Sequence, residues 1–328
     1  MRAAFYERTG AAREVLQVGE LPTPEPGPGE VRVKLATSGV NPSDVKSRAG
    51  LRTKTLPFAR IVPHSDGAGV IDAVGEGVPR TRLGERVWTW NAAWKRPFGT
   101  AAQFVALPAQ QAVRLPEAVG FDVGACLGIP ALTALHAVRM DGGVAGKTVL
   151  VTGGAGAVGH YAIQMAKLSG AEQVIATVSN AHKAALAEQA GADLVLDYRS
   201  EDVAARVLEA TDGEGADRVI DVDFAANVNE SLAAVRAEGD IVVYGSGKPE
   251  IAVPFYPAIV KNVRVRFFIV YNLSAGDRAA AIAQLTRWLE HGCLKHNIAA
   301  RLPLAKIAEA HELVESGRAV GNVVIEID

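Results

Sequence analysis

Cysteine is scarce in this chain of 328 residues, which contains only Cys126 and Cys293, far apart in the sequence. Two such residues cannot form a disulfide framework or a site of four thiolates, so the sequence predicts a protein of a reducing compartment. No stretch reaches the roughly 18 apolar residues of a membrane-spanning helix. The first residues, Met-Arg-Ala-Ala-Phe-Tyr-Glu-Arg, contain no apolar signal core. We therefore expect a soluble cytoplasmic protein without a membrane partner.

Neither positive nor negative charge is in excess. Lys and Arg number 34 and Asp and Glu number 36, which leaves a net charge of −2 at pH 7. Without a basic field the chain has no electrostatic basis for holding nucleic acid, so no nucleic-acid partner is expected. Hydrophobic residues make up 49% and charged residues 21%, a composition typical of a folded globular protein. The length suits about two domains.

The pattern of secondary structure changes near residue 122. Over residues 1–122, short strand-like segments alternate with turns rich in glycine and proline, which predicts a small β-rich domain. Over residues 123–270, brief apolar strands alternate with helical segments and end at Val263–Val270, which predicts an α/β fold with a doubly wound parallel sheet of the Rossmann type. Because that sheet is complete at six strands, residues 271–328 are expected to return to the first domain.

The strand Thr148–Thr152 runs into three glycines and then into a helix. Gly153 permits a tight turn, Gly156 lets backbone N–H groups approach a pyrophosphate, and Gly159 lets the helix pack closely. A glycine triplet alone is weak evidence for a dinucleotide site, and the alternative is a glycine-rich turn that binds no ligand. Here the triplet opens a repeating β-α series, the context that indicates a dinucleotide-binding turn. The turn residues predicted to bind the cofactor are Gly153, Ala155, Gly156, Ala157, Val158 and Gly159.

No Asp or Glu closes the second strand of this series, about twenty residues after the glycines, where NAD-binding proteins hold the ribose with an acid. The stretch Ala176-Thr-Val-Ser-Asn-Ala-His-Lys183 instead offers Ser179 as a hydrogen-bond donor and Lys183 as a positive charge. Both groups suit a 2′-phosphate. The alternative is that Lys183 is only a solvated residue of the helix. The missing acid nevertheless favours NADPH as the cofactor.

Further motifs are spread over the whole chain: Asn41-Pro-Ser-Asp44, His64-Ser-Asp-Gly-Ala-Gly-Val70, Gly128-Ile-Pro-Ala-Leu-Thr133 and Tyr244-Gly-Ser-Gly247. With the glycine turn, they resemble those of the zinc-independent quinone oxidoreductases of the medium-chain dehydrogenase/reductase superfamily, the group that includes zeta-crystallin. The resemblance implies a GroES-like β-rich catalytic domain and a Rossmann domain that bind NADPH in the cleft between them. It also implies a homodimer joined through the sixth Rossmann strand, and an exposed apolar edge strand invites such pairing independently.

Zinc-dependent members of that superfamily carry Cys or His ligands at three positions, which here are Asn41, Ser65 and the neighbourhood of Gly128. The segment between Trp88 and Phe104, which would hold a second zinc, contains no cysteine. Because Zn²⁺ needs about four N, S or O ligands that converge on one point, we expect no metal cofactor.

Other roles carry over by position. Asn41 resembles an active-site asparagine near the nicotinamide and could donate an amide N–H to the acceptor oxygen as negative charge develops there. Lys46 and His64 are candidate catalytic helpers. Several relatives have a tyrosine at the position of Lys46, so the role of that tyrosine cannot be assumed here. For His64, the alternative to a catalytic role is a histidine that is hydrogen-bonded in a turn. The resemblance also implies cofactor contacts along the whole dinucleotide. At the nicotinamide and its ribose it implies contacts from Ile129, Thr133, Gly245, Ser246, Phe268 and Val270. At the adenosine it implies a contact from Tyr198.

Three tryptophans, Trp88, Trp90 and Trp94, lie close together and could line a flat apolar pocket. Trp88 alternates like a core residue, so Trp90 and Trp94 are the candidate pocket residues. These features favour an NADPH-dependent oxidoreductase that transfers hydride to a quinone or an α,β-unsaturated carbonyl. Enoyl thioesters are a narrower alternative, and an NADPH-binding protein with little turnover, of crystallin or sensor type, is an alternative from another class.

Overall fold

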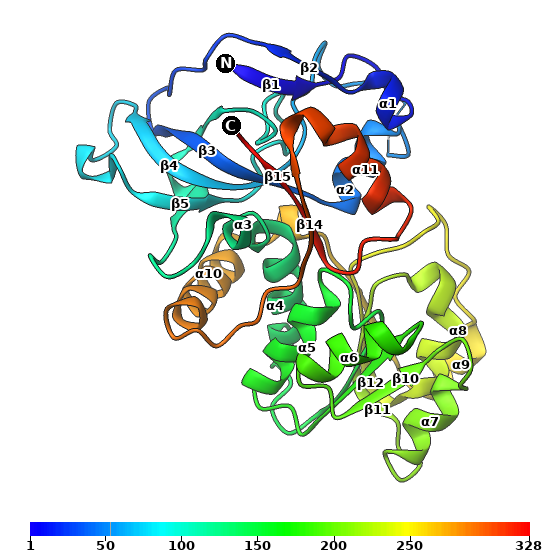
Figure 1. The fold of residues 1–328 in the computed structure, drawn as a ribbon. Helices are drawn as coiled ribbons and strands as arrows, with labels where there is room; N and C mark the ends of the chain where they lie inside the picture. The colour runs from blue at the N-terminus through cyan, green and yellow to red at the C-terminus, as the bar shows by residue number, and fades with distance from the viewer. Residues whose placement is uncertain (53) are drawn as a thin grey trace. The chain divides into compact units, whose positions relative to one another are not determined.

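The computed structural model describes residues 1–52 and 54–328, which form two compact units (Figure 1). The first unit consists of Met1–Pro130 and Thr286–Asp328, and the second is Ala131–Leu285. Within the described part of the chain, no helix combines the length and the apolarity that crossing a membrane requires.

The two units divide later in the chain than the expected boundaries after residues 122 and 270. The first division falls inside a π-helical turn, Leu127–Ala131, and the second inside helix α10 (Ala275–Glu290). The chain therefore passes from one unit to the other within helical segments.

A seven-stranded sheet forms the first unit. Its strands are β3 (Glu30–Val40), β4 (Asp66–Val74), β5 (Arg86–Thr89), β6 (Phe104–Pro108), β7 (Ala112–Arg114), β14 (Ile298–Pro303) and β15 (Asn322–Glu326). The order is β14-β15-β3-β4-β5-β7, with β6 also paired to β3. Alternate residues of β3, Val31, Val33 and Leu35, are buried, as expected for a strand with one face on the core. The C-terminal residues complete this sheet, because β15 pairs with β3.

Shorter elements surround that sheet. A two-stranded ribbon joins β1 (Arg2–Phe5) and β2 (Gln17–Glu20). The C-terminal helix α11 packs beside α1 and α2 (Figure 1). The helices of this unit are α1 (Ala12–Val15), α2 (Pro42–Arg48), α3 (Phe121–Gly124) and α11 (Ile307–Glu315).

The second unit contains a six-stranded parallel sheet. Its strands are β8 (Thr148–Val151), β9 (Gln173–Val178), β10 (Leu194–Asp197), β11 (Ala216–Asp221), β12 (Val235–Val243) and β13 (Arg264–Phe267). The order β10-β9-β8-β11-β12-β13 is that of a doubly wound Rossmann sheet. Consecutive residues of β8, Val149, Leu150 and Val151, are all buried, which requires cover on both faces. The predicted fold class is confirmed.

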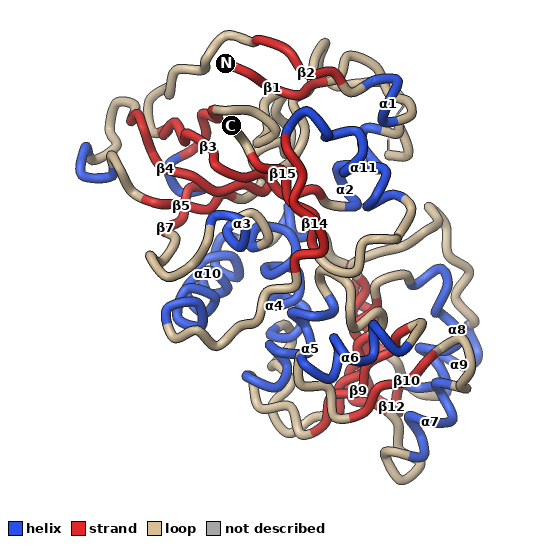
Figure 2. Tube along the Cα trace, in the orientation of Figure 1, coloured by secondary structure: helices blue, strands red, loops and turns tan. Residues whose placement is uncertain are grey.

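Helices lie on both sides of this sheet (Figure 2). One group packs in the succession α4, α5 and α6, and the other in the succession α7, α8 and α9. The expected sixth strand, Val263–Val270, is shorter in the structure, because the chain leaves β13 after Phe267 and enters a 3-10 turn at Val270–Asn272. The helices are α4 (Leu132–Arg139), α5 (Gly159–Leu168), α6 (Ala181–Gln189), α7 (Val203–Glu209), α8 (Phe224–Ala234) and α9 (Phe255–Val260).

Candidate active site

The glycine turn lies between β8 and α5. Gly153 has a φ of 68°, in the left-handed region that favours glycine. A Cβ on Gly159 would lie 2.3 Å from the carbonyl oxygen of Gly153, so the turn itself requires a residue without a side chain there. Gly156 is partly exposed in the turn, three residues before α5 begins. The turn therefore fits a pyrophosphate, and the same turn contains Ala155, Ala157 and Val158.

Ser179 and Lys183 lie side by side just beyond β9. The Lys183 Nζ donates a hydrogen bond to the Ser179 Oγ at 2.9 Å. Asn180 caps α6, since its Oδ1 accepts from the backbone N–H of Lys183 at 3.0 Å. Tyr198, which is 48% exposed, follows β10, and the backbone N–H of Tyr198 donates to the carbonyl oxygen that ends β9. The three residues predicted for the adenosine end of the cofactor thus share one edge of the sheet.

Asp221 closes β11 at the same edge, and the sequence did not indicate its role. Its carboxylate accepts hydrogen bonds from the Ser231 Oγ at 2.6 Å, the Asn227 Nδ2 at 3.0 Å and the backbone N–H of Asp223 at 2.9 Å. Burial raises the pKa of Asp221, and these hydrogen bonds oppose that shift. Asp221 therefore fixes the start of α8 against the end of β11.

The residues expected near the nicotinamide from the second unit follow β12 and β13. A Cβ on Gly245 would lie 2.1 Å from the carbonyl oxygen of Val222, so the loop of Gly245 and Ser246 passes directly against the loop that follows β11. Phe268 is half-buried and Val270 is buried. Both lie after the end of β13 rather than on it.

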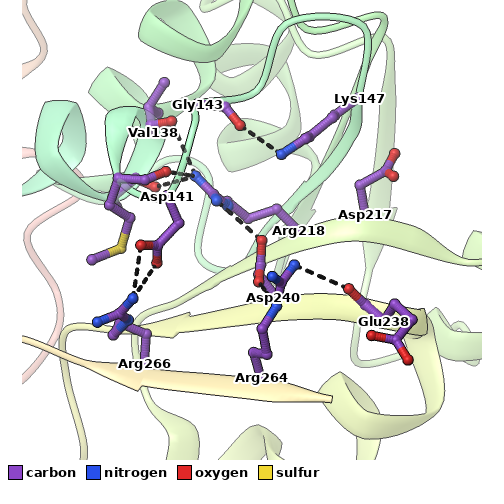
Figure 3. Close-up of polar contacts among 12 residues, drawn as sticks. Val138, Asp141, Gly143, Lys147, Asp217, Arg218, Glu238, Asp240, Arg264 and Arg266 are labelled. Carbon is purple, nitrogen blue, oxygen red and sulfur yellow. Dashed lines mark hydrogen bonds and ion pairs between the residues drawn. The ribbon is translucent and has the colours of Figure 1, made fainter. Parts of the chain in front are cut away.

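A buried ion pair fixes α4 to the sheet (Figure 3). Arg218, on β11, is fully buried, and its Nη2 lies 3.1 Å from the Oδ2 of Asp240. The Nη1 of Arg218 donates to carbonyl oxygens at the C-terminal end of α4. Arg264 and Arg266, on β13, extend the network to Asp240 at 2.8 Å and to the loop after α4 at 2.7 Å. This network holds in place the helix whose first turn contains Thr133.

In the first unit, Asn41 follows β3 and caps the N-terminus of α2. Its backbone N–H donates to the Asp44 Oδ2 at 2.9 Å, and its side-chain Nδ2 donates to the Asp66 Oδ2 at 2.9 Å. The backbone N–H of Ile129 donates to the same Asp66 oxygen, also at 2.9 Å. Two predicted cofactor contacts, Asn41 and Ile129, therefore meet at one carboxyl group.

Both carboxyl groups of this corner are buried. Burial raises the pKa of Asp44 to about 7, and the hydrogen bonds from Asn41 oppose the shift. Burial, together with the charge of Asp44, raises the pKa of Asp66 well above its usual range. Hydrogen bonds to Asp66 from Asn41 and Ile129 only partly offset that effect. Burial and the nearby charge of Asp44 therefore both favour the protonated form of Asp66.

His64 is fully buried and is bonded through both ring nitrogens. Its Nδ1 lies 2.8 Å from the Ser38 Oγ and its Nε2 lies 2.9 Å from the His311 Nε2. The Thr100 hydroxyl donates its hydrogen to the backbone carbonyl of Asp66. The Thr100 oxygen therefore accepts from the Ser38 hydroxyl, and the Ser38 oxygen accepts from the His64 Nδ1–H. Burial lowers the pKa of His64 to about 3, which favours the neutral ring. This environment matches the alternative of a hydrogen-bonded histidine in a turn.

The remaining candidates of the first unit are placed on α2 and after β5. Lys46 is half-buried on α2. Trp88 is fully buried in β5, as its alternation predicts, whereas Trp90 and Trp94 are half-buried. The ammonium group of Lys95 lies 5.9 Å from the centre of the Trp94 ring. The catalytic role of Lys46 and the pocket role of the two tryptophans stay predictions.

The three positions that carry zinc ligands in other members of the superfamily have a different arrangement here. A Cβ on Gly128 would lie 2.3 Å from the Asp66 Oδ1, so a ligating side chain does not fit there unless Asp66 moves. Asn41 is engaged with Asp66, and Ser65 is buried. Among the residues that the structure describes, no group of three or more His, Cys, Asp or Glu could hold a metal ion.

Comparisons with known proteins agree with this architecture. The profile of the Alcohol dehydrogenase GroES-like domain matches residues 27–117, and that of the Zinc-binding dehydrogenase family matches residues 157–289. A quinone oxidoreductase of Pseudomonas aeruginosa is 32% identical over 318 residues, which cover 95% of each chain. The chain belongs to the quinone oxidoreductase family. Membership of this family, within the medium-chain dehydrogenase/reductase superfamily, confirms the resemblance that the motifs indicate.

Solved structures of the same superfamily superpose over nearly the whole chain. One, described as an NAD-dependent alcohol dehydrogenase, has a TM-score of 0.92 at 32% identity and covers 100% of both chains. The quinone oxidoreductase of Escherichia coli complexed with NADPH has a TM-score of 0.87 at 27% identity, over 99% of this chain and 100% of that one. The quinone oxidoreductase fold is therefore shared in full.

Proposed function

We propose that this protein binds NADPH and transfers hydride from it to a quinone or an α,β-unsaturated carbonyl. The observation that carries the proposal is the carboxyl edge of the Rossmann sheet. There the glycine turn before α5 suits a pyrophosphate, and one strand away the Lys183–Ser179 pair suits a 2′-phosphate. The Escherichia coli relative complexed with NADPH supports this cofactor, and the name of the Pseudomonas aeruginosa relative supports a quinone acceptor.

Bound NADPH supplies the hydride, and the protein orients the reactants, excludes water and stabilises the charge that develops on the acceptor oxygen. An amide nitrogen carries two hydrogens. One hydrogen of Asn41 is directed to Asp66, and the second is the proposed donor to the acceptor oxygen. Lys46 is the proposed cationic helper, and Trp90 and Trp94 are the proposed pocket residues. For His64 we retain only a positioning role, because both of its ring nitrogens are engaged.

The test is multiple turnover with a panel of acceptors. NADPH oxidation is followed with a benzoquinone, a naphthoquinone, an alkenal and an enoyl thioester, and we expect many turnovers with a quinone or the alkenal. Gly156→Glu should abolish NADPH binding, since it places a negative charge against the pyrophosphate. The matched control is Gly276→Glu, because Gly276, on α10, has open space around it.

Two results would contradict the proposal, and a third would narrow it. Tight NADPH binding without turnover of any acceptor would indicate a binding protein rather than a reductase. Turnover of the enoyl thioester alone would indicate the narrower activity. A failure of the wild type to bind NADPH would overturn the proposal entirely.

We also propose a homodimer joined through β13, and a cytoplasmic location. β13 is an edge strand of its sheet, and Phe267 at its end is 58% exposed. On α9, Phe255 and Tyr256 are 73% and 74% exposed. An exposed edge with nearby apolar side chains invites pairing with a second chain. Both cysteines, Cys126 and Cys293, are free thiols, which suits a reducing compartment.

A further inference from the structure

Asp66 lies at the centre of the Asn41 corner. It begins β4 and is fully buried. Its Oδ2 accepts hydrogen bonds from the Asn41 side chain and from the Ile129 backbone, both at 2.9 Å. These donors come from distant parts of the sequence, and both are expected to contact the nicotinamide. A single oxygen atom therefore sets the position of two groups that the proposed reaction requires.

The other carboxyl oxygen of Asp66, Oδ1, has no hydrogen-bond partner among the described residues. It faces Gly128, where a Cβ would lie only 2.3 Å away. An unpaired negative oxygen inside a protein costs far more free energy than an unpaired hydroxyl. The geometry instead suits a neutral acid, in which Oδ1 carries the proton and Oδ2 uses its two lone pairs on its two N–H donors.

Within residues 1–52 and 54–328, the titratable neighbours of Asp66 provide no compensating positive charge. Asp44, on α2, is a second carboxyl, and its charge opposes ionisation of Asp66. The thiol of Cys126, after α3, is buried and its pKa is raised well above the usual range, so it is neutral. His64, in the segment before β4, is neutral and its Nδ1 proton is directed to Ser38. None of these groups is cationic near neutral pH.

We propose that Asp66 is a positioning residue that acts as a neutral acid and fixes the Asn41 amide and the Ile129 backbone for hydride transfer. The inference rests on the proposed function, in which those two groups face the nicotinamide. Asp66 is buried and acts only through them. Ionisation of Asp66 at high pH would leave a bare anion at Oδ1 and would disturb both groups together.

Two substitutions separate this role from a charged or purely structural one. Asp66→Asn keeps the accepting oxygen and replaces the hydroxyl by an amide nitrogen, so we expect kcat within about threefold of the wild type. Asp66→Ala removes the oxygen, and we expect kcat to fall about tenfold or more, with a smaller change in the Kd for NADPH. The matched control is Asp72→Asn on the same strand, where the carboxylate pairs with Arg32 near the surface.

The decisive measurement is a pH titration by nuclear magnetic resonance. Because the Asn41 side-chain amide and the Ile129 backbone amide donate to one oxygen, their chemical shifts should move together, with one midpoint above the usual carboxyl range. The alkaline decline of kcat should share that midpoint. Both effects should persist in Asp72→Asn and vanish in Asp66→Asn.

Each outcome bears on the proposal. Separate midpoints for the two amides, or a kcat of Asp66→Asn as low as that of Asp66→Ala, would overturn it. If Asp66→Ala does not fold, the comparison of Asp66→Asn with the wild type and the shared midpoint still decide. If the wild type binds NADPH but turns over neither a quinone nor an α,β-unsaturated carbonyl, the proposed function is refuted. The titration still tests the protonation state of Asp66 separately.

Discussion

Replacing Lys183 should remove most of the preference for NADPH over NADH. The half-buried Lys183 side chain holds its Nζ 2.9 Å from the Ser179 Oγ at the end of β9. Opposite unit charges about 4 Å apart attract by ~1 kcal/mol in bulk water and by ~4 kcal/mol near a protein surface. Loss of lysine hydration and of side-chain freedom reduces the net gain. We therefore expect Lys183→Ala to weaken NADPH binding by about 1–3 kcal/mol, roughly 5- to 150-fold, and to leave NADH binding unchanged.

The assay is fluorescence titration of each dinucleotide with the wild type, Lys183→Ala and Lys167→Ala. Lys167 is the matched control, because it lies in the last turn of α5, at the opposite end from the glycine turn, and pairs with Asp193 at 2.9 Å. The preference for NADPH should also decline with ionic strength, as expected for a partly exposed charge pair. An unchanged ratio of the two dissociation constants in Lys183→Ala, or an equal loss in Lys167→Ala, would refute the reasoning.

Three further predictions concern metal content, assembly and pH. Elemental analysis should find no stoichiometric zinc, and chelators should leave turnover intact, because Asn41, Ser65 and Gly128 occupy the ligand positions; one tightly held zinc per chain would contradict this. Val265→Pro removes a backbone donor from β13 and should give monomers or aggregates in light scattering, whereas a stable monomer of the unmodified protein at micromolar concentration would argue against the dimer. Burial raises the pKa of Asp44 to about 7 in the folded protein, above its unfolded value of ~3.9. The stabilising contribution of Asp44 to the free energy of unfolding is therefore fully present below about pH 4. It is lost as the pH rises through about 7, and the total loss is up to ~4 kcal/mol. Urea unfolding at pH 5 and pH 8 should show a smaller loss of stability for Asp44→Asn than for the wild type, and parallel losses would be the contrary result.

The Rossmann sheet could be predicted from the sequence because its strands are short apolar runs, as expected for parallel strands buried on both faces. Two helices could not. α4 begins two residues after Pro130 in a short segment that is buried almost throughout, and α9 contains Pro257 and is covered with exposed apolar side chains. The sixth strand was overestimated because its apolar run continues to Val270, beyond the last ladder pair at Phe267. Hydrophobic periodicity reports only side-chain polarity, whereas the residue at which a strand ends depends on backbone pairing.

In the candidate site, too, features made of consecutive residues could be predicted, whereas contacts between residues far apart in the sequence could not. The glycine turn and the Ser179–Lys183 pair could be found because each is contained in a few consecutive residues. Asp66 and His311 could not, because their partners are far away in the chain. The one signal for Asp66 was a carboxylate directly before the apolar run Gly67–Ile71, which in a folded protein requires hydrogen-bond partners.

The pairing of β15 with β3 has a consequence for synthesis on the ribosome. Val323 pairs with Val40, the residue before Asn41, and about 280 residues lie between them. At ~5–20 residues per second, roughly 15–60 s pass between their emergence. During that time Ala131–Leu285, a continuous segment, can fold, while the end of β3 has an open edge that another nascent chain could pair with. The strand that borders Asn41 is therefore made long before the residues that complete its pairing.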